Sequence, residues 1–237
     1  MAPAPSAERA REQLAAVVAE GSALELPANL PPTKRPRAAA VLILFGVLDR
    51  VPSEREASGD PEASVSHDLD VLLLARATTL RAHAGQIAFP GGRMDAGDAG
   101  PIAAALREAE EETGLDPGGV AVLGALPDVP LARSGHLVTP VIGWWERPSA
   151  VRVVDEAESS AVFRVPVADL LDPRNRGVTV LRRGGQEWRG PGFLVRAGGA
   201  ERLVWGFTAM LLDGLFTRVG WTESWDQARE LPLDGWV

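Results

Sequence analysis

Short apolar runs, separated by polar or glycine-containing turns, recur along most of this chain and limit it to a fold rich in short strands. The longest run, Ala38–Val47, has the length of a buried strand and falls short of the roughly 18 residues that suggest a membrane span. We expect strands at 39–48, 71–76, 120–126, 139–144, 161–165, 178–182, 192–196 and 202–205, and helices at 6–21, 101–113 and 207–216. The pattern predicts an α+β fold with a mixed β-sheet and a few covering helices.

The length of 237 residues suits one well-filled domain with extensions. We expect an N-terminal helix and Pro-rich connector at 1–36, the main domain at 37–220, and a Trp-rich tail at 221–237 that packs on the domain. With no cysteine, the chain has no disulfide, thiolate metal site or cysteine nucleophile. The first residues lack a signal-peptide pattern, so we expect a cytoplasmic protein without a membrane anchor. The sequence does not predict the oligomeric state.

The formal net charge of −8 argues against a general nucleic-acid-binding protein, because such proteins need a basic surface. A small anionic ligand can still bind where positive charge, or a metal ion, is gathered locally. The charge therefore favours a small-molecule partner.

The densest chemistry lies in a predicted helix that begins at Pro101 and ends before Gly114. Proline suits the first helical position, and glycine suits a left-handed cap at the end. At about 100° per residue, a helical wheel groups Ile102, Leu106, Ala109 and Thr113 on one face, which we expect to face the core.

The same wheel places Glu108, Glu111 and Glu112 together on one flank, three and four residues apart. Like charges at these spacings repel, and they lie near the helix end where the dipole disfavours anions. Mg²⁺ or Mn²⁺ would remove the repulsion, because these hard cations bind carboxylate oxygens. The alternative is a solvated acidic face, the commoner explanation of a glutamate run taken alone.

The neighbourhood of this run resembles the Nudix box, in which a glycine and an acidic residue precede the pattern R-E-x-x-E-E-x-G. The matching positions are Gly92, Arg107, Glu108, Glu111, Glu112, Gly114 and Leu115. Two features depart from the box. Asp98 stands where glutamate is usual, and one extra residue separates it from Arg107, which puts any role of Asp98 in doubt.

A second pattern is similar to the signature that accompanies the Nudix box in coenzyme A pyrophosphatases. It comprises Leu73, Leu74, Arg76, Ala77, Arg81, Gly85 and the run Phe89-Pro90-Gly91-Gly92, with Ala75 where threonine is typical. The likeness extends from about residue 38 to 216 and leaves out the N-terminal helix and the tail.

This resemblance implies a Nudix-type α/β/α sandwich with a catalytic loop-helix-loop, and metal-dependent hydrolysis of coenzyme A to 3',5'-ADP and a 4'-phosphopantetheine species. Glu108, Glu111 and Glu112 are the implied ligands of Mg²⁺ or Mn²⁺. The catalytic candidates are Glu108, Glu111 and Glu158, and the base is either Glu108 or Glu158. Glu158 lies in an acidic loop and is equally explained as a solvated charge.

The remaining candidates concern the substrate and the support of the helix. Arg76 and Arg81 are expected to contact phosphates, although a lone arginine is more often a surface charge. Gly91 and Gly92 are expected to form a tight loop whose backbone approaches the metal and phosphate, or an ordinary turn. Arg107 and Gly114 are expected to be structural supports, with Arg107 paired to Glu111 or to a carboxylate behind the helix.

Two other functions stay open. One is a Nudix pyrophosphatase for ADP-ribose, NADH-type dinucleotides or oxidised nucleotides, for which Ala75 leaves room. The other is a non-catalytic nucleotide-sensing module, against which the retained glutamates argue.

Overall fold

The computed structural model describes residues 7–24, 26, 36–47, 68–79, 83–131 and 135–236. Its helices are α1 (Ala7–Glu20), α2 (Pro101–Thr113), α3 (Val167–Leu171) and α4 (Gly206–Arg218), with the 3-10 helices η1 (Pro117–Gly119) and η2 (Pro173–Asn175). The strands are β1 (Arg37–Val47), β2 (Leu69–Arg76), β3 (Ile87–Ala88), β4 (Gly91–Arg93), β5 (Val120–Ala125), β6 (Val129–Leu131), β7 (His136–Trp145), β8 (Ser159–Pro166), β9 (Arg176–Arg183), β10 (Gln186–Ala197), β11 (Ala200–Val204) and β12 (Glu230–Leu231).

Among the described residues, the larger sheet has eight strands, and its main path runs β3-β2-β1-β7-β5. Strand β4 also pairs with β1, β6 with β7, and β8 with β2. Strands β1 and β7 are parallel, whereas the other pairs in this sheet are antiparallel. The predicted α+β fold with a mixed sheet is therefore confirmed.

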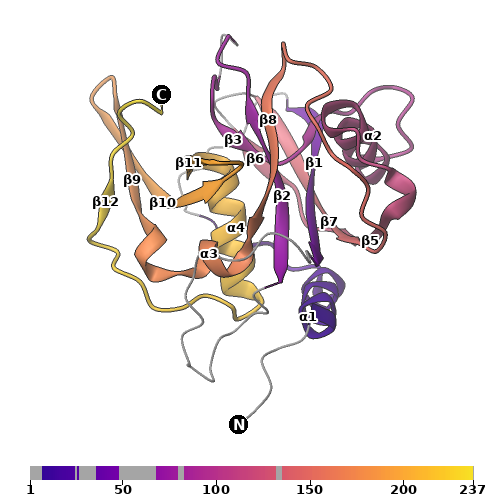
Figure 1. The fold of residues 1–237 in the computed structure, drawn as a ribbon, viewed down its shortest axis with the longest axis horizontal. Coiled ribbons are helices and arrows are strands. Elements are labelled where there is room, and N and C mark those ends of the chain that lie inside the picture. Colours follow the sequence, from indigo (N-terminus) through magenta and orange to yellow (C-terminus); the bar gives the residue numbers. More distant parts are fainter. Residues whose placement is uncertain are drawn as a thin grey trace.

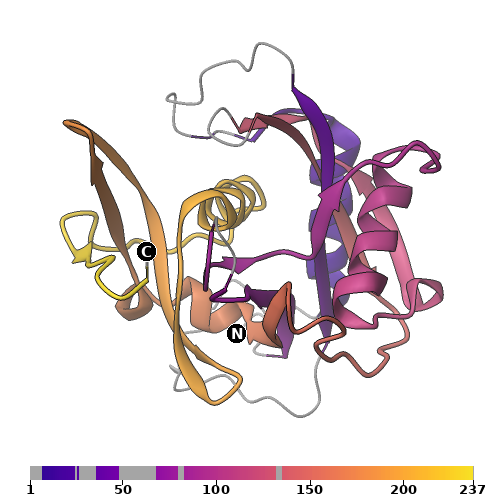
Figure 2. The same ribbon diagram turned by 90° about the horizontal axis from the view of Figure 1, so that it is seen from above.

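Strand β1 is apolar after Arg37, and from Ala39 onward residues on both of its faces are buried. Leu42 and Leu44 join the core under α2, whereas Ile43 and Phe45 join the larger core on the opposite face. Figures 1 and 2 show α2 on one side of the eight-stranded sheet, with α4 and the smaller sheet on the other side. This layering positions the acidic helix along one face of the central strands.

The smaller sheet has, in the same described ranges, four strands in the order β11-β10-β9-β12. The apolar pattern of the sequence did not distinguish it from the larger sheet. Strand β12 comes from the tail and pairs in parallel with β9. Trp221, also in the tail, is buried and packs edge-on against Phe45. Its indole N–H donates to Gln13 Oε1 of α1 at 3.0 Å, so this contact joins the two ends of the described chain.

Each strand and helix expected from the apolar pattern is present, with ends that differ by a few residues. The pattern missed β3, β4, β6, α3 and β12, because segments of two to five residues carry too little periodicity to recognise. The domain boundaries at residues 36 and 220 stay a prediction. Within the described ranges, no helix has the length and apolar character needed to cross a membrane.

Candidate active site on helix α2

Helix α2 has the ends that its sequence predicts. Pro101 occupies the first turn, and Gly114 takes a left-handed conformation with φ of 68° and donates its N–H to Glu110 O. One expectation about this helix is wrong in part: Ile102 is exposed rather than in the core. The buried face consists of Ala104, Ala105, Ala109, Glu112 and Thr113. Small alanines let the helix lie close to β1 and β4, so this face carries a carboxylate toward the sheet.

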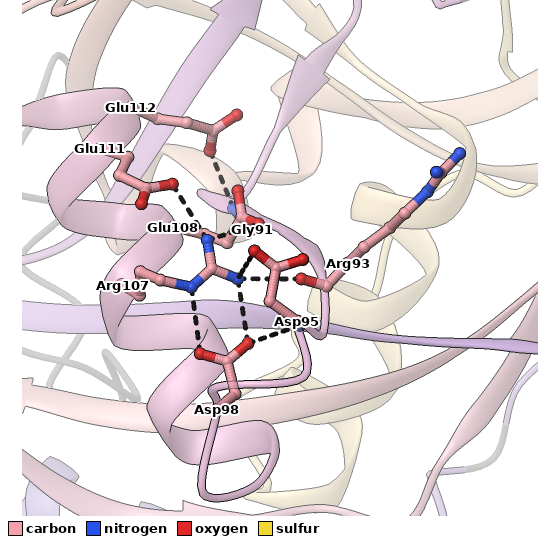
Figure 3. Close-up of polar contacts among 8 residues, drawn as sticks. All are labelled: Gly91, Arg93, Asp95, Asp98, Arg107, Glu108, Glu111 and Glu112. Carbon is pink, nitrogen blue, oxygen red and sulfur yellow. Dashed lines mark hydrogen bonds and ion pairs between the residues drawn. The ribbon is translucent and has the colours of Figure 1, made fainter.

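Glu112 is the most buried of the three candidate metal ligands on α2, with 8% of its surface exposed. The N–H of Gly91 donates to its Oε2 at 2.9 Å, as Figure 3 shows. Burial raises the pKa of Glu112 to about 7, and the negative charges of Glu108 and Glu158 act in the same direction. The Gly91 N–H and the charge of Arg76 oppose this rise in pKa. Glu112 is therefore a buried acid surrounded by more negative than positive charge.

Glu108 is half-buried against the backbone of Gly92. A Cβ added to Gly92 would lie 2.5 Å from the Glu108 carboxyl carbon, so only glycine leaves room for this carboxylate. Burial raises the pKa of Glu108, whereas the hydrogen bond and charge of Arg107 oppose the rise.

The two glycines do not form the expected tight loop. They belong to β4, where Gly91 pairs with Val41 and Gly92 with Ala40 of β1. A Cβ on Gly91 would lie 2.4 Å from Ala40 O, so the strand can pass this closely only without a side chain. The backbone of these glycines does approach the site closely, as expected. It does so as part of strand β4, and it contacts the carboxylates of Glu112 and Glu108.

Arg107 lies at the centre of the exposed part of the cluster (Figure 3). Its Nη1 is 3.1 Å from Glu108 Oε1 and 3.0 Å from Glu111 Oε2, so the expected pair with Glu111 is present. Its Nη2 donates to Arg93 O at 3.0 Å, which ties the helix to β4. Glu111 itself is 59% exposed.

Asp98 is the residue whose role the extra spacer before Arg107 put in doubt. Its two carboxylate oxygens accept from Nε and Nη2 of Arg107, each at 3.0 Å, and 6% of its side chain is exposed. These hydrogen bonds lower the pKa of Asp98 and raise the pKa of Arg107. The extra residue before the helix is accommodated in the turn, so Asp98 still reaches Arg107. The acidic position of the box was the signal that could have identified this contact.

Arg76 and Glu158 come to the same site through the pairing of β2 with β8. Arg76 lies opposite Ser159, and the Ala77 N–H donates to Glu158 O at 2.9 Å. Both charges act on Glu112, although Glu158 is exposed. The structure thus brings together every candidate residue except Arg81, which lies outside the described residues.

The carboxylate oxygens of the cluster are ligands of the type that a hard divalent cation prefers. They do not yet surround a single position as a complete set of metal ligands. In the part of the chain that the structure describes, no three acidic or histidine side chains already converge as a metal site. Glu108 and Glu111 are engaged by Arg107, and Glu112 by one backbone N–H. A buried carboxylate with surplus negative charge around it nevertheless fits Mg²⁺ or Mn²⁺, which take oxygen ligands and contribute positive charge.

Comparison with known proteins decides the family. A family model described as the NUDIX domain matches residues 63–183, about half of the chain. This chain belongs to the NUDIX family of hydrolases. It is 42% identical over 156 residues to a Nudix hydrolase of Salmonella paratyphi B named NudL and described as uncharacterized, and 41% identical to NudL of Escherichia coli. Each match covers 63% of this Nudix chain and 75% of the relative.

Solved Nudix structures are more distant. The NUDIX domain of Shewanella oneidensis NrtR, complexed with ADP ribose, has a TM-score of 0.41 at 23% identity and covers 61% of this chain and 82% of that domain. A C. elegans Ap4A hydrolase binary complex has a TM-score of 0.37 at 17% identity, covering 52% of this chain and 76% of the hydrolase. At these scores the likeness adds nothing to the family assignment.

Proposed function

We propose that this Nudix protein hydrolyses the pyrophosphate bond of coenzyme A and its thioesters, releasing 3',5'-ADP and 4'-phosphopantetheine species, with Mg²⁺ or Mn²⁺ as cofactor. The observation that carries the proposal is Glu112, a buried carboxylate with raised pKa that is paired to a backbone N–H and flanked by Glu108 and Glu158. A bound cation would stabilise the ionised form of this carboxylate, and a metal ion neutralises the charge of a diphosphate during its hydrolysis.

Glu108, Glu111 and Glu112 would hold the metal ion in this proposal. When bound, a divalent cation neutralises charge on the phosphoryl oxygens and polarises water. Glu108 and Glu111 would have to exchange their contacts with Arg107 for contacts with the cation. Arg107 would then remain anchored through Asp98 and Arg93 O, which supports its assignment as a structural residue.

The remaining chemistry belongs to the chain's own side chains. Water attacks one phosphorus atom, the bridging P–O bond breaks, and a carboxylate takes the proton from water. Glu108 and Glu158 are the two candidate bases that the resemblance implies, and the charges of both raise the pKa of Glu112. Comparing the pH–rate profiles of Glu108→Gln and Glu158→Gln identifies the base, because its loss removes the acidic limb of the profile.

Arg76 and Arg81 are the proposed phosphate-binding residues, on the strength of the coenzyme A signature. Ala75, the departure from that signature, is buried in the core on the face of β2 turned away from Arg76. A residue in that position does not face the substrate, so the departure does not favour ADP-ribose over coenzyme A.

A substrate panel tests the proposal. Coenzyme A, an acyl-coenzyme A, ADP-ribose, NADH and an oxidised nucleotide are incubated with Mg²⁺ or Mn²⁺, and products are resolved by chromatography. We expect 3',5'-ADP from the coenzyme A forms. Intact coenzyme A beside consumed ADP-ribose would support the other pyrophosphatase assignment, and turnover of no compound would support a nucleotide-sensing module.

The metal assignment has its own test. Glu112→Gln should lose at least about two orders of magnitude in rate with the fold retained, because the substitution removes a charged ligand. Glu110→Gln is the matched control, since Glu110 is exposed on the other flank of the same helix. Equal activity of the two variants would refute the metal assignment.

A further inference from the structure

Strands β2 and β8 pair with one irregularity beside the site. Ala75 lies opposite Ala161, but Arg76 lies opposite Ser159, so Ser160 is an extra residue on β8. Side chains alternate between the faces of a strand, and one extra residue moves the next side chain to the other face. The bulge at Ser160 thus places Ser159 on the face of the sheet that carries Arg76.

Two hydrogen-bond donors lie unpaired at this point. Ser159 is 1% exposed, and its Oγ has no hydrogen-bond partner among the described residues. The Nε of Arg76, directly across the strand pair, is also buried without a partner in the same ranges. Burying an unpaired donor costs free energy, so these two neighbouring donors are available to a ligand that accepts hydrogen bonds.

The donors are located at the edge of the carboxylate cluster. Arg76 acts electrostatically on Glu112, and so does Glu158, the residue immediately before Ser159. A hydroxyl and a guanidinium N–H together suit a ligand oxygen that only accepts hydrogen bonds and carries negative charge. A phosphate oxygen has this chemistry, and it is the group that a cation at Glu112 would also attract.

We infer that Ser159 and Arg76 together bind one oxygen of the substrate's diphosphate, and that the bulge at Ser160 delivers Ser159 to this position. The inference rests on the proposed function, because it assumes a diphosphate substrate at the carboxylate cluster. Ser159 carries no role in the sequence signatures, so only the register shift identifies it.

The inference separates binding from stability. Ser159→Ala removes a buried unpaired hydroxyl, so the melting temperature should stay the same or rise. The same variant should lower kcat/KM about tenfold or more, since it removes a hydrogen bond to a charged group. A purely structural serine would give the opposite combination, a lower melting temperature with little change in kcat/KM of the folded protein.

The experiment compares Ser159→Ala, Ser159→Thr and Ser160→Ala on any diphosphate substrate that the wild-type protein hydrolyses. Ser160→Ala is the matched control, because it keeps the extra residue and removes only a hydroxyl that donates to Ala75 O and Arg76 O. We expect a loss of activity in Ser159→Ala alone and at least partial recovery in Ser159→Thr. In an Arg76→Ala background, Ser159→Ala should add less than its separate loss, because both residues bind the same oxygen.

A second measurement separates this inference from the proposed function. Calorimetry records the binding of inorganic pyrophosphate with Mg²⁺ to the wild-type protein and to Ser159→Ala. Weaker binding by the variant supports the inference even if no compound of the panel is hydrolysed. Equal activity and equal pyrophosphate binding in Ser159→Ala and Ser160→Ala would overturn the inference and leave the proposed function standing. A wild-type protein that neither binds pyrophosphate nor hydrolyses any compound would overturn both.

Discussion

Asp70 on β2 and Glu112 on α2 are two buried carboxylates, and their surroundings differ. Arg164 Nη2 lies 2.7 Å from Asp70 Oδ1 and Nε donates to the same oxygen at 2.9 Å, while the guanidinium stacks over Trp145 at 4.8 Å. Glu112 accepts from a backbone N–H and is flanked by further carboxylates. Burial raises the pKa of each to about 7, and the charge of Arg164 opposes the rise at Asp70.

The difference indicates what each carboxylate is for. Asp70 has its counter-ion within the chain, because Arg164 contacts its Oδ1 across the β2–β8 pair, so Asp70 belongs to the framework that joins these strands. Glu112 has no arginine bonded to it: its one hydrogen-bond donor is a backbone N–H, and the charges of Glu108 and Glu158 add to the rise in its pKa while the charge of Arg76 opposes it. A bound cation would supply the positive charge that a direct arginine partner supplies at Asp70. On this argument we propose that Glu112 belongs to the functional site.

The largest expected effect concerns the framework pair. Arg164→Met leaves Asp70 buried without its cation and should cost about 3–5 kcal/mol of unfolding free energy. Urea denaturation measures this loss. The double variant Asp70→Asn with Arg164→Met should recover much of it, because neither charge then remains. A single variant as stable as the wild-type protein would show that the pair is not what stabilises this part of the sheet.

The next effect concerns pH in the metal-free protein. The unfolded chain ionises Glu112 near its ordinary pKa of 4.5, whereas the folded protein does so at about 7. Between these values the folded state keeps a proton that the unfolded state has lost, so rising pH favours unfolding. The contribution of Glu112 to the free energy of unfolding is fully present below pH 4.5 and is lost as the pH rises to about 7. At about 1.4 kcal/mol per pKa unit, the loss amounts to roughly 3 kcal/mol.

Denaturation in a chelator across this pH range measures that loss, and the difference between wild type and Glu112→Gln isolates it from Asp70. The variant should show a flatter dependence of stability on pH. Added Mg²⁺ at alkaline pH should then stabilise the wild-type protein more than the variant. Identical pH curves and identical responses to Mg²⁺ would erase the distinction between the two carboxylates.

A smaller effect is expected from Gly92→Ala. The new Cβ would lie 2.5 Å from the Glu108 carboxyl group, which is the mobile end of a side chain and can move away. Stability should therefore change little, whereas activity on the substrate found in the panel should fall roughly 10- to 100-fold, because a displaced carboxylate no longer has the productive geometry. Gly97→Ala is the control, since a Cβ there meets no atom within 4 Å. Equal activity of the two variants would contradict the assignment of Glu108 to the active site.

The smallest effect is expected at an ion pair on the surface. Arg182 pairs with Glu187 at 2.9 Å and Glu230 at 3.4 Å, and its side chain is 61% exposed. Water solvates these charges whether or not they pair, so Arg182→Ala should leave the melting temperature within measurement error. A large loss would mean that exposure is a poor guide to which ion pairs matter in this protein.

The sequence by itself determined the local features of this protein. The limits of α2 follow from Pro101 and Gly114, whose backbone preferences do not depend on distant contacts. The longer strands follow from their apolar runs, and the acidic flank of the helix follows from its period. The box around Gly92 and Arg107 placed the chain in its family.

Only the tertiary structure decided which charges meet. Helical periodicity put Ile102 in the core, but the close approach of α2 to β4 selected the alanine face and buried Glu112 instead. The spacing before Arg107 obscured Asp98, because a turn can absorb a residue without moving the carboxylate away from its partner. Ser159 reaches Arg76 only through a register shift between strands about eighty residues apart. Which side chains become buried, and which residues lie opposite one another, depends on strand pairing and packing across the whole fold. No local sequence pattern contains that information.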